Sequence, residues 1–150
     1  MIEVRTDAPS ETLTLGQRLA SILQPGDVLL LNGSLGTGKT LLTSGIAEGL
    51  GITTRVSSPS FILARRYDDG FLPLIHADVY RLDSIAEFND LELQTEAADG
   101  VLVIEWGEAV AASVTGDRLE IHIAMDGENA RSFRLEPHGS WASRSLEGMA

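Results

Sequence analysis

A glycine-rich loop between an apolar run and an apolar-periodic segment most constrains how this chain folds. The loop reads GSLGTGKT over residues 33–40 and matches the phosphate-binding pattern G-x-x-x-x-G-K-[ST] at every fixed position. The apolar run before it, Val28–Leu31, predicts a buried strand, because a central parallel strand is apolar on both faces. After the loop, apolar residues recur at near-helical spacing as far as Leu50, and Gly51 is typical of a helix C-terminus. Strand, loop and helix in this order predict a P-loop nucleotide-binding unit.

The residue types of the loop suit a bound anion. Glycines let backbone N–H groups curl around phosphate, and the helix that starts near Lys39 points its positive end at the loop. We expect Lys39 to reach the β- and γ-phosphates and the Thr40 hydroxyl to ligate Mg²⁺. Lys39 is the only lysine beside ten arginines, at a position where a compact ammonium fits better than a planar guanidinium. The predicted phosphate-binding residues are Gly33, Ser34, Leu35, Gly36, Thr37, Gly38, Lys39 and Thr40.

Composition narrows the function classes. A length of 150 residues suits one domain, predicted to span 1–150, and a hydrophobic content of 43% indicates a globular chain. No apolar run approaches the roughly 20 residues that cross a membrane, and the N-terminus does not resemble a signal peptide. Together with the absence of cysteine, this favours a cytoplasmic protein without membrane contact. A net charge of −11 argues against direct binding of nucleic acid.

Two further strands are predicted to end in carboxylates. Val101–Ile104 is an apolar run that ends on Glu105 and resembles a Walker B element, whose acid holds Mg²⁺ directly or through water. Leu74–Ala77 ends on Asp78, and such strand ends face the ligand crevice of an α/β fold. We predict that Glu105 holds the metal with Thr40 and that Asp78 orients water or a switch segment. Either carboxylate alone could equally be structural.

Three other segments allow a structural and a functional interpretation. Residues 56–61, rich in serine, form either a surface turn or a switch segment in which a hydroxyl such as that of Ser60 approaches the γ-phosphate or Mg²⁺. The acidic stretch 87–99 is either a solvated face or a partner-binding surface. His122 and His138 show no carboxylate or cysteine at metal-ligand spacing, and we interpret both as structural.

The rest of the chain predicts edge, hairpin and helix elements. These are an edge strand at 1–4, a helix capped by Asp7 and ended by Pro25, strands at 61–67 and 71–77, a helix capped by Ser84, strands at 119–124 and 132–136, and a final helix from Ser140.

Four motifs together resemble the TsaE family of tRNA threonylcarbamoyladenosine biosynthesis ATPases. They are GSLGTGKT at 33–40, SPSF at 58–61, HADVYRL at 76–82 and IEWGE at 104–108, where family members typically read GDLGAGKT, SPTF or SPTY, HxDxYRL and (I/V)EWPE. The resemblance spans about residues 10–136, and four motifs in order and register make it specific. The chain departs from the family pattern at Ser34, Ser60, Gly107 and at Glu92, where a Leu-Gly pair is common.

The resemblance implies a P-loop NTPase-like three-layer α/β sandwich with a small mixed, mostly parallel sheet. It implies an ATPase that binds ATP and Mg²⁺, associates with a TsaB–TsaD heterodimer, and meets tRNA only through that complex. In this sequence it implies that Lys39 and Thr40 hold phosphate and Mg²⁺, that Glu105 and Asp78 are the essential acids, and that Trp106 lies close to the nucleotide. ATP hydrolysis then supports turnover of the partner complex, which itself transfers the threonylcarbamoyl group.

Other functions share the same loop chemistry. A small-molecule phosphotransferase is the main alternative, although its lid is usually rich in arginine and the arginines here are scattered. A GTPase is disfavoured, because its guanine-reading N-K-x-D motif needs a second lysine. A module that binds nucleotide without hydrolysing it also fits the motifs.

Overall fold

The computed structural model describes residues 1–34, 36–59, 64–79, 85–107 and 110–149. Within them the strands are β1 (Ile2–Thr6), β2 (Val28–Asn32), β3 (Ala64–Tyr67), β4 (Leu74–Asp78), β5 (Val101–Glu105), β6 (Arg118–Met125) and β7 (Arg131–His138). The α-helices are α1 (Pro9–Ala20), α2 (Lys39–Gly49), α3 (Ile85–Asp90) and α4 (Leu93–Glu96). Short 3₁₀ helices follow at η2 (Ala111–Ser113), η3 (Gly139–Ser143) and η4 (Glu147–Met149).

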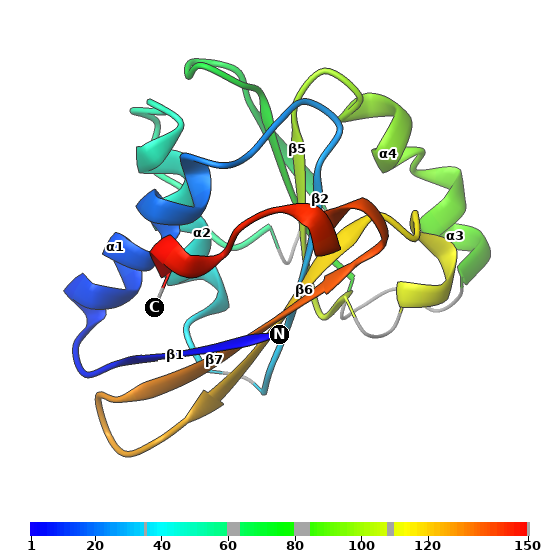
Figure 1. Cartoon of the computed structure of the whole chain (residues 1–150). Coiled ribbons are helices and arrows are strands. Elements are labelled where there is room, and N and C mark those ends of the chain that lie inside the picture. The colour runs from blue at the N-terminus through cyan, green and yellow to red at the C-terminus, as the bar shows by residue number, and fades with distance from the viewer. Residues whose placement is uncertain (35, 60–63, 80–84, 108–109, 150) are drawn as a thin grey trace.

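The strands form one mixed sheet in the order β1-β7-β6-β2-β5-β4-β3 (Figure 1). The central strands β6, β2, β5 and β4 are parallel to one another, and β7 and β3 pair antiparallel with β6 and β4. Because β1 is antiparallel to β7, it points the same way as β6. Five of the seven strands therefore share one direction, as the predicted mixed, mostly parallel sheet requires.

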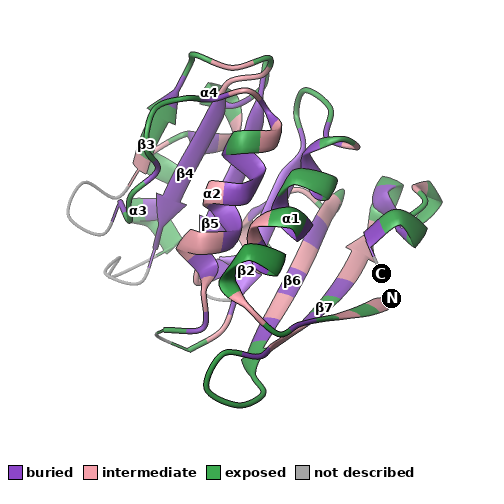
Figure 2. Ribbon diagram, turned by 90° about the vertical axis from the view of Figure 1, so that its left-hand side faces the viewer, coloured by how far each residue is buried: buried purple, intermediate pink, exposed green. Residues whose placement is uncertain are grey.

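Helices cover both faces of the sheet and enclose two apolar clusters. On one face α1 and α2 lie over the strands (Figure 2), and Leu42 of α2 packs in a cluster that includes Leu31 of β2. On the other face Phe88 of α3 packs in a cluster that includes Leu30 of β2. Strands β2, β4 and β5 are buried along their whole length, because both of their faces are covered. The predicted three-layer α/β sandwich is confirmed.

Helices α1 and α2 approach each other closely at two glycines. A Cβ at Gly16 of α1 would lie 2.6 Å from the Leu42 carbonyl oxygen, and one at Gly45 of α2 would lie 2.4 Å from the Leu13 carbonyl oxygen. Glycine removes the side chain that would separate the two backbones. This contact fixes the position of α2, whose first turn follows the phosphate loop.

Two predictions about the helices are wrong. The N-cap of α1 is Ala8 and not Asp7. The backbone N–H of Asp7 instead donates a hydrogen bond to Glu11 Oε1 at 2.9 Å. The predicted final helix from Ser140 is instead the 3₁₀ helices η3 and η4, interrupted at residues 144–146. Its buried residues Trp141, Leu146 and Met149 explain this, because spacings of five and three residues do not follow one face of an α-helix.

The predicted edge strand and hairpins are present. β1 lies at one edge of the sheet, and β3–β4 and β6–β7 form antiparallel pairs. The first residues of the strand predicted at 61–67 and the predicted cap Ser84 lie outside the described residues. In the described part of the chain, none of the helices has the length and apolar character needed to cross a membrane.

Candidate functional site

The glycine-rich loop leads from β2 into α2 at the carboxyl end of the parallel strands. Gly36 and Gly38 have φ angles of 79° and 102°, in the left-handed region that favours glycine. Gly38 is the N-cap of α2, so Lys39 and Thr40 occupy its first turn. The backbone at this point therefore directs the N-terminus of a three-turn helix at the loop, as phosphate binding requires.

Lys39 lies inside the loop. The residue is only 5% exposed. Its Nζ donates to the carbonyl oxygens of Gly33 at 2.6 Å and Ser34 at 3.0 Å. The Thr37 hydroxyl donates to the same Ser34 carbonyl at 2.8 Å. The ammonium also lies 4.1 Å from the ring centroid of Trp106, in a cation–π contact. The predicted phosphate-binding lysine is thus held between the loop backbone and an indole face.

Thr40 and Glu105 meet across the site. The Thr40 hydroxyl donates to Glu105 Oε2 at 2.9 Å, joining the end of the glycine-rich motif to the end of β5. The parallel register of β4 and β5 places Asp78 directly beside Glu105. Both carboxylates are buried, with exposures of 6% for Asp78 and 4% for Glu105. The structure therefore brings the two predicted acids and the predicted metal-ligating hydroxyl together.

His76 positions Glu105 from the neighbouring strand. It is fully buried on β4, two residues before Asp78, and its Nε2 lies 2.5 Å from Glu105 Oε2. Glu105 Oε2 therefore contacts both the imidazole and the Thr40 hydroxyl. Two contacts to one buried oxygen fix the rotamer of the carboxylate and aim its remaining lone pairs.

A pocket of about 300 Å³ opens at these residues. It is lined by Gly36, Gly38, Lys39, Thr40, Leu41, Ser58, Asp78, Glu105 and Trp106. The set contains an ammonium, two hydroxyls and two carboxylates, and oxygen donors such as these hydroxyls and carboxylates are what Mg²⁺ prefers. The lining residues thus fit a magnesium-bound nucleoside triphosphate. Of the other predicted contacts, Gly33, Ser34 and Thr37 shape the loop, whereas Leu35 and Ser60 lie outside the described residues.

The turn after Glu105 is tightly held. Trp106 has a φ angle of 64°, unusual for a residue with a side chain, and its backbone N–H donates to the Leu31 carbonyl at 2.9 Å. Gly107 is buried, and a Cβ there would lie 2.5 Å from Cβ of Leu30. Backbone strain of this kind persists where the surroundings over-determine it. Here the strained conformation belongs to the residue whose indole covers Lys39.

Sequence reasoning missed Arg131, which contacts the loop from β7. Its Nε donates to the Thr37 carbonyl at 3.1 Å and its Nη2 to the Gly36 carbonyl at 3.5 Å. Its Nη1 donates to carbonyls of the β6–β7 turn, including that of Ala130 at 2.9 Å. No motif marks an arginine more than 90 residues from the loop that it contacts. The only available signal is its place directly before the strand predicted at 132–136.

A larger pocket, of about 430 Å³, lies at the opposite end of β2. Its charged lining includes Asp27 and Arg144, which form two hydrogen bonds of 2.7 Å with each other. The carboxylate and the guanidinium thus satisfy one another. Volume alone does not mark this pocket as the reactive site, because the clustered acids and the lysine lie elsewhere.

Comparison with known proteins gives concordant matches. The family model described as "Threonylcarbamoyl adenosine biosynthesis protein TsaE" matches residues 6–133. A "tRNA threonylcarbamoyladenosine biosynthesis protein TsaE" from Bacillus subtilis is 42% identical over 137 residues, covering 91% of this chain and 85% of the relative. A protein of the same name from Streptomyces coelicolor is 47% identical over 113 residues, covering 73% of this chain and 76% of the relative.

A solved structure shares the fold. The crystal structure of YdiB from Bacillus subtilis matches with a TM-score of 0.76 and 37% sequence identity. The match covers 92% of this chain and 86% of that chain.

Proposed function

The chain belongs to the family of the threonylcarbamoyl adenosine biosynthesis protein TsaE, and from this premise we propose that it binds Mg-ATP and hydrolyses it in support of tRNA threonylcarbamoyladenosine formation. Its curated relatives carry the name of that biosynthesis. The observation that carries the ATPase proposal is the hydrogen bond between the Thr40 hydroxyl and Glu105 Oε2. It joins the end of the glycine-rich motif to the Walker-B-like acid in the pocket that Lys39 lines.

Each residue has a distinct task in this proposal. Lys39 leaves the carbonyls of Gly33 and Ser34 and places its charge on the β- and γ-phosphates, where negative charge develops as the γ-phosphoryl departs. Backbone N–H groups of the loop bind the same phosphates. Thr40 and Glu105 supply the oxygens for Mg²⁺, which when bound neutralises phosphate charge.

Asp78 and its neighbours complete the task. Asp78 is beside Glu105 in register, so its carboxylate can accept a hydrogen bond from the attacking water and orient it. His76 holds Glu105 through Oε2 and keeps the acid in place without touching the reacting atoms. Trp106 covers Lys39 and borders the space for the nucleotide.

We propose that a TsaB–TsaD-like heterodimer completes the site. The described residues that line the pocket include no arginine, and Arg81 lies outside the described residues. An arginine supplied in trans accelerates related reactions by about 10³–10⁵, so we expect slow hydrolysis by the isolated chain. The net charge of −11 favours indirect contact with tRNA through the partner proteins. We place this assembly in the cytoplasm.

The test measures ATP hydrolysis by the chain alone, with the host TsaB–TsaD pair, and with that pair plus tRNA, while modified tRNA is counted per complex. We expect stimulation by the pair and several rounds of modification only when ATP is hydrolysed. Lys39→Ala and Glu105→Gln should abolish both readouts, whereas the exposed carboxylate variant Glu147→Gln should match the unaltered chain. Several rounds of modification without ATP hydrolysis, or phosphorylation of a small acceptor in place of phosphate release, would sink the proposal.

A further inference from the structure

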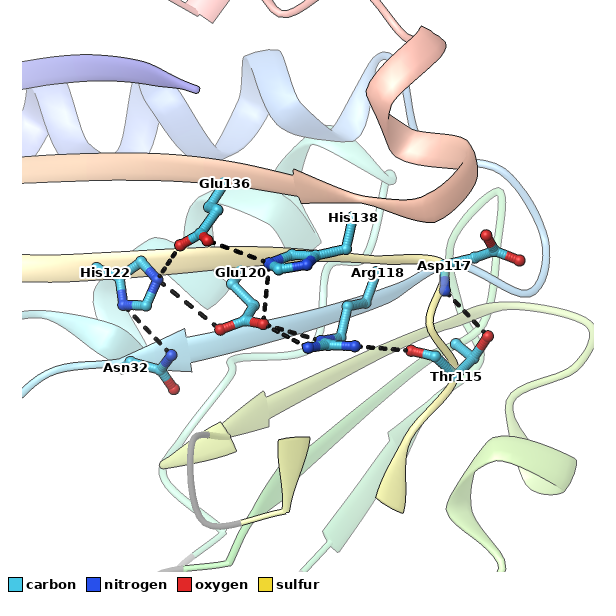
Figure 3. Close-up of polar contacts among 8 residues, drawn as sticks. All are labelled: Asn32, Thr115, Asp117, Arg118, Glu120, His122, Glu136 and His138. Atoms are coloured by element: carbon cyan, nitrogen blue, oxygen red, sulfur yellow. Dashed lines mark hydrogen bonds and ion pairs between the residues drawn. The ribbon is translucent and has the colours of Figure 1, made fainter. Parts of the chain in front are cut away.

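A second cluster of ionisable side chains lies on the sheet away from the nucleotide pocket. Along β6 the apolar residues Leu119, Ile121 and Ile123 pack in the cluster under α1 and α2. The side chains between them therefore point to the opposite face, where β6 and β7 present polar groups (Figure 3). These are Arg118, Glu120 and His122 from β6 and Glu136 and His138 from β7.

The register of the hairpin opposes two like charges. Glu120 pairs directly with Glu136, and Arg118 pairs with His138. Like charges directly opposite on neighbouring strands destabilise a sheet. Arg118 places a positive charge on Glu120, and a cation shared with Glu136 would relieve the repulsion further. The Glu120 side chain is only 12% exposed, which strengthens the repulsion because water screens it poorly.

His138 directs a ring nitrogen at both carboxylates. Its Nε2 lies 3.1 Å from Glu120 Oε2 and 3.5 Å from Glu136 Oε1. This nitrogen is shielded from solvent and, within the described part of the chain, makes no hydrogen bond of acceptable geometry. Donor atoms of the three residues all lie within 4.8 Å of one another. A nitrogen in this position can bind a cation together with both carboxylates.

We propose that Glu120, Glu136 and His138 bind a divalent transition-metal ion of the zinc type. One imidazole nitrogen with two carboxylate oxygens is a donor set that zinc accepts with three protein ligands and one open position. Donors bound at about 2.0–2.2 Å in a tetrahedron lie roughly 3.3–3.6 Å apart. The contacts of His138 Nε2 with Glu120 and Glu136, at 3.1 and 3.5 Å, are close to that separation, so small side-chain movements complete the site.

Neighbouring side chains orient the ligands. Arg118 donates to Glu120 Oε2 through Nε at 2.9 Å, and His122 Nε2 lies 2.9 Å from Glu136 Oε2. The contact of His122 Nδ1 with the Asn32 amide, at 3.5 Å, suits a tautomer with the proton on Nε2, which then donates to Glu136. Outer hydrogen bonds of this kind hold metal ligands in place.

The sequence contains the pairs that form this cluster, but their spacing indicates a shared site only when both segments are strands. His122 follows Glu120 by two residues, and His138 follows Glu136 by two. In a strand such pairs share a face, and an antiparallel partner doubles the set. The hairpin register places His138 beside carboxylates of both strands, which its interpretation as lacking a carboxylate at metal-ligand spacing did not foresee.

The test is metal binding by the full chain without nucleotide or magnesium. Zn²⁺ is titrated into chelator-treated protein by calorimetry, and Co²⁺ serves as a spectroscopic probe of coordination geometry. We expect one ion per chain and a Co²⁺ spectrum of four-coordinate type. Glu136→Gln and His138→Gln should each weaken Zn²⁺ binding by at least about tenfold, as even outer-shell losses cost 10–100-fold.

Two matched variants separate this site from others. Glu128→Gln removes an exposed carboxylate from the turn between the same strands and should bind Zn²⁺ as the unaltered chain does. Asp78→Asn should also leave Zn²⁺ binding unchanged, because it alters only the nucleotide pocket. Circular dichroism verifies that each variant is folded, and if His138→Gln does not fold, Glu136→Gln decides the matter.

Three results would overturn the proposal. The unaltered chain could bind no Zn²⁺, which would leave the five side chains as an ion-pair network only. Glu136→Gln could bind as tightly as Glu128→Gln. Asp78→Asn could abolish the binding, which would assign the ion to the nucleotide pocket.

Discussion

Glu92 occupies a backbone conformation that a residue with a side chain adopts at a cost. Its φ angle is 50°, at the N-cap of α4, and this is the position where a Leu-Gly pair is common in the family. The left-handed region costs a non-glycine residue about 1–2 kcal/mol, while glycine loses about 0.5–1 kcal/mol more chain entropy on folding. Glu92→Gly should therefore raise the free energy of unfolding by about 0.5–1 kcal/mol, measured by urea denaturation.

Glu92→Ala is the matched control for that prediction. It removes the same carboxylate but keeps the Cβ, so it should not stabilise the protein by the same amount. Equal effects of glycine and alanine would show that the carboxylate, and not the backbone angle, sets the stability at this position.

Asp69 is held as a carboxylate in the turn between β3 and β4. Its Oδ2 accepts hydrogen bonds from the hydroxyl and backbone N–H of Thr53, at 2.8 and 2.9 Å, and from those of Thr54. These bonds, the Thr53 hydroxyl first, lower the pKa of Asp69 from its usual 3.8 to about 2. The stabilisation is fully present above about pH 4 and is lost as the pH falls toward 2, because the folded chain then binds the proton less readily than the unfolded chain.

Removing the hydroxyl tests this assignment. Thr53→Val should raise the pKa of Asp69 toward 3.8, and Thr54→Val should raise it less, since the Thr54 hydroxyl is the weakest of the donors. An NMR titration of the Asp69 carboxyl carbon gives both values. Titration of Asp69 at its usual pKa in the unaltered chain would contradict the prediction.

Single residues show where sequence patterns suffice and where they fail. Lys39, Thr40 and Glu105 could be predicted because strand, loop and helix signals are local and the chemistry demands those residue types. The cation–π contact of Trp106 with Lys39 could not be predicted, because it depends on a left-handed backbone angle after β5. The hydrogen bond from His76 to Glu105 joins residues 29 positions apart, and it likewise depends on the register of β4 and β5.

At the scale of elements, the contact between α1 and α2 depends on glycine. Alanine is favoured over glycine in a helix interior by about 1 kcal/mol, so helix propensity alone predicts that Gly45→Ala stabilises the protein. The Cβ of that alanine would instead lie 2.4 Å from the Leu13 carbonyl oxygen. Overpacking of this kind typically costs about 1–3 kcal/mol, so Gly45→Ala should lower the free energy of unfolding by that amount.

The control is Gly116→Ala, at a glycine where an added Cβ meets no atom within 4 Å. Urea denaturation of both variants gives the comparison. If Gly45→Ala is as stable as Gly116→Ala or more so, then the helices move apart without cost and the close approach does not fix α2.

Elements also differ in how well their ends follow from sequence. The bounds of β2 follow directly from an apolar run ended by glycine, and the start of α2 from the phosphate-binding motif. The bounds of the C-terminal elements could not be predicted in this way, because the buried residues Trp141 and Leu146 contact the core through two short turns. Such a segment takes its shape from the surface that it covers and not from local propensity.

At the scale of the whole molecule, the sheet order joins two halves that sequence reasoning treated separately. Local patterns indicate the hairpin of β6 and β7, but they do not show that β6 pairs with the phosphate-loop strand β2. That pairing is non-local, with partners such as Leu30 and Glu120 some 90 residues apart. As a result the turn of the hairpin lies beside the phosphate loop, where Arg131 bridges the two.

This bridge predicts that the antiparallel half of the sheet tunes nucleotide affinity. Arg131 donates both to Thr37 in the loop and to Ala130 in the turn, so it limits loop conformations that bind phosphate poorly. Hydrogen bonds from a charged group contribute about 1.5–3 kcal/mol, and about 1.4 kcal/mol corresponds to tenfold in affinity. Arg131→Ala should therefore weaken ATP binding roughly tenfold in calorimetry, with magnesium present.

Arg134→Ala is the matched control, since it removes an exposed guanidinium three residues along the same strand. It lowers the positive charge of the chain equally, so a general electrostatic effect on an anionic nucleotide would appear in both variants. Weakened binding in Arg131→Ala alone would assign the effect to the bridge. Equal dissociation constants for the two variants would mean that the loop keeps its shape without β7, and that the nucleotide site depends on the parallel strands only.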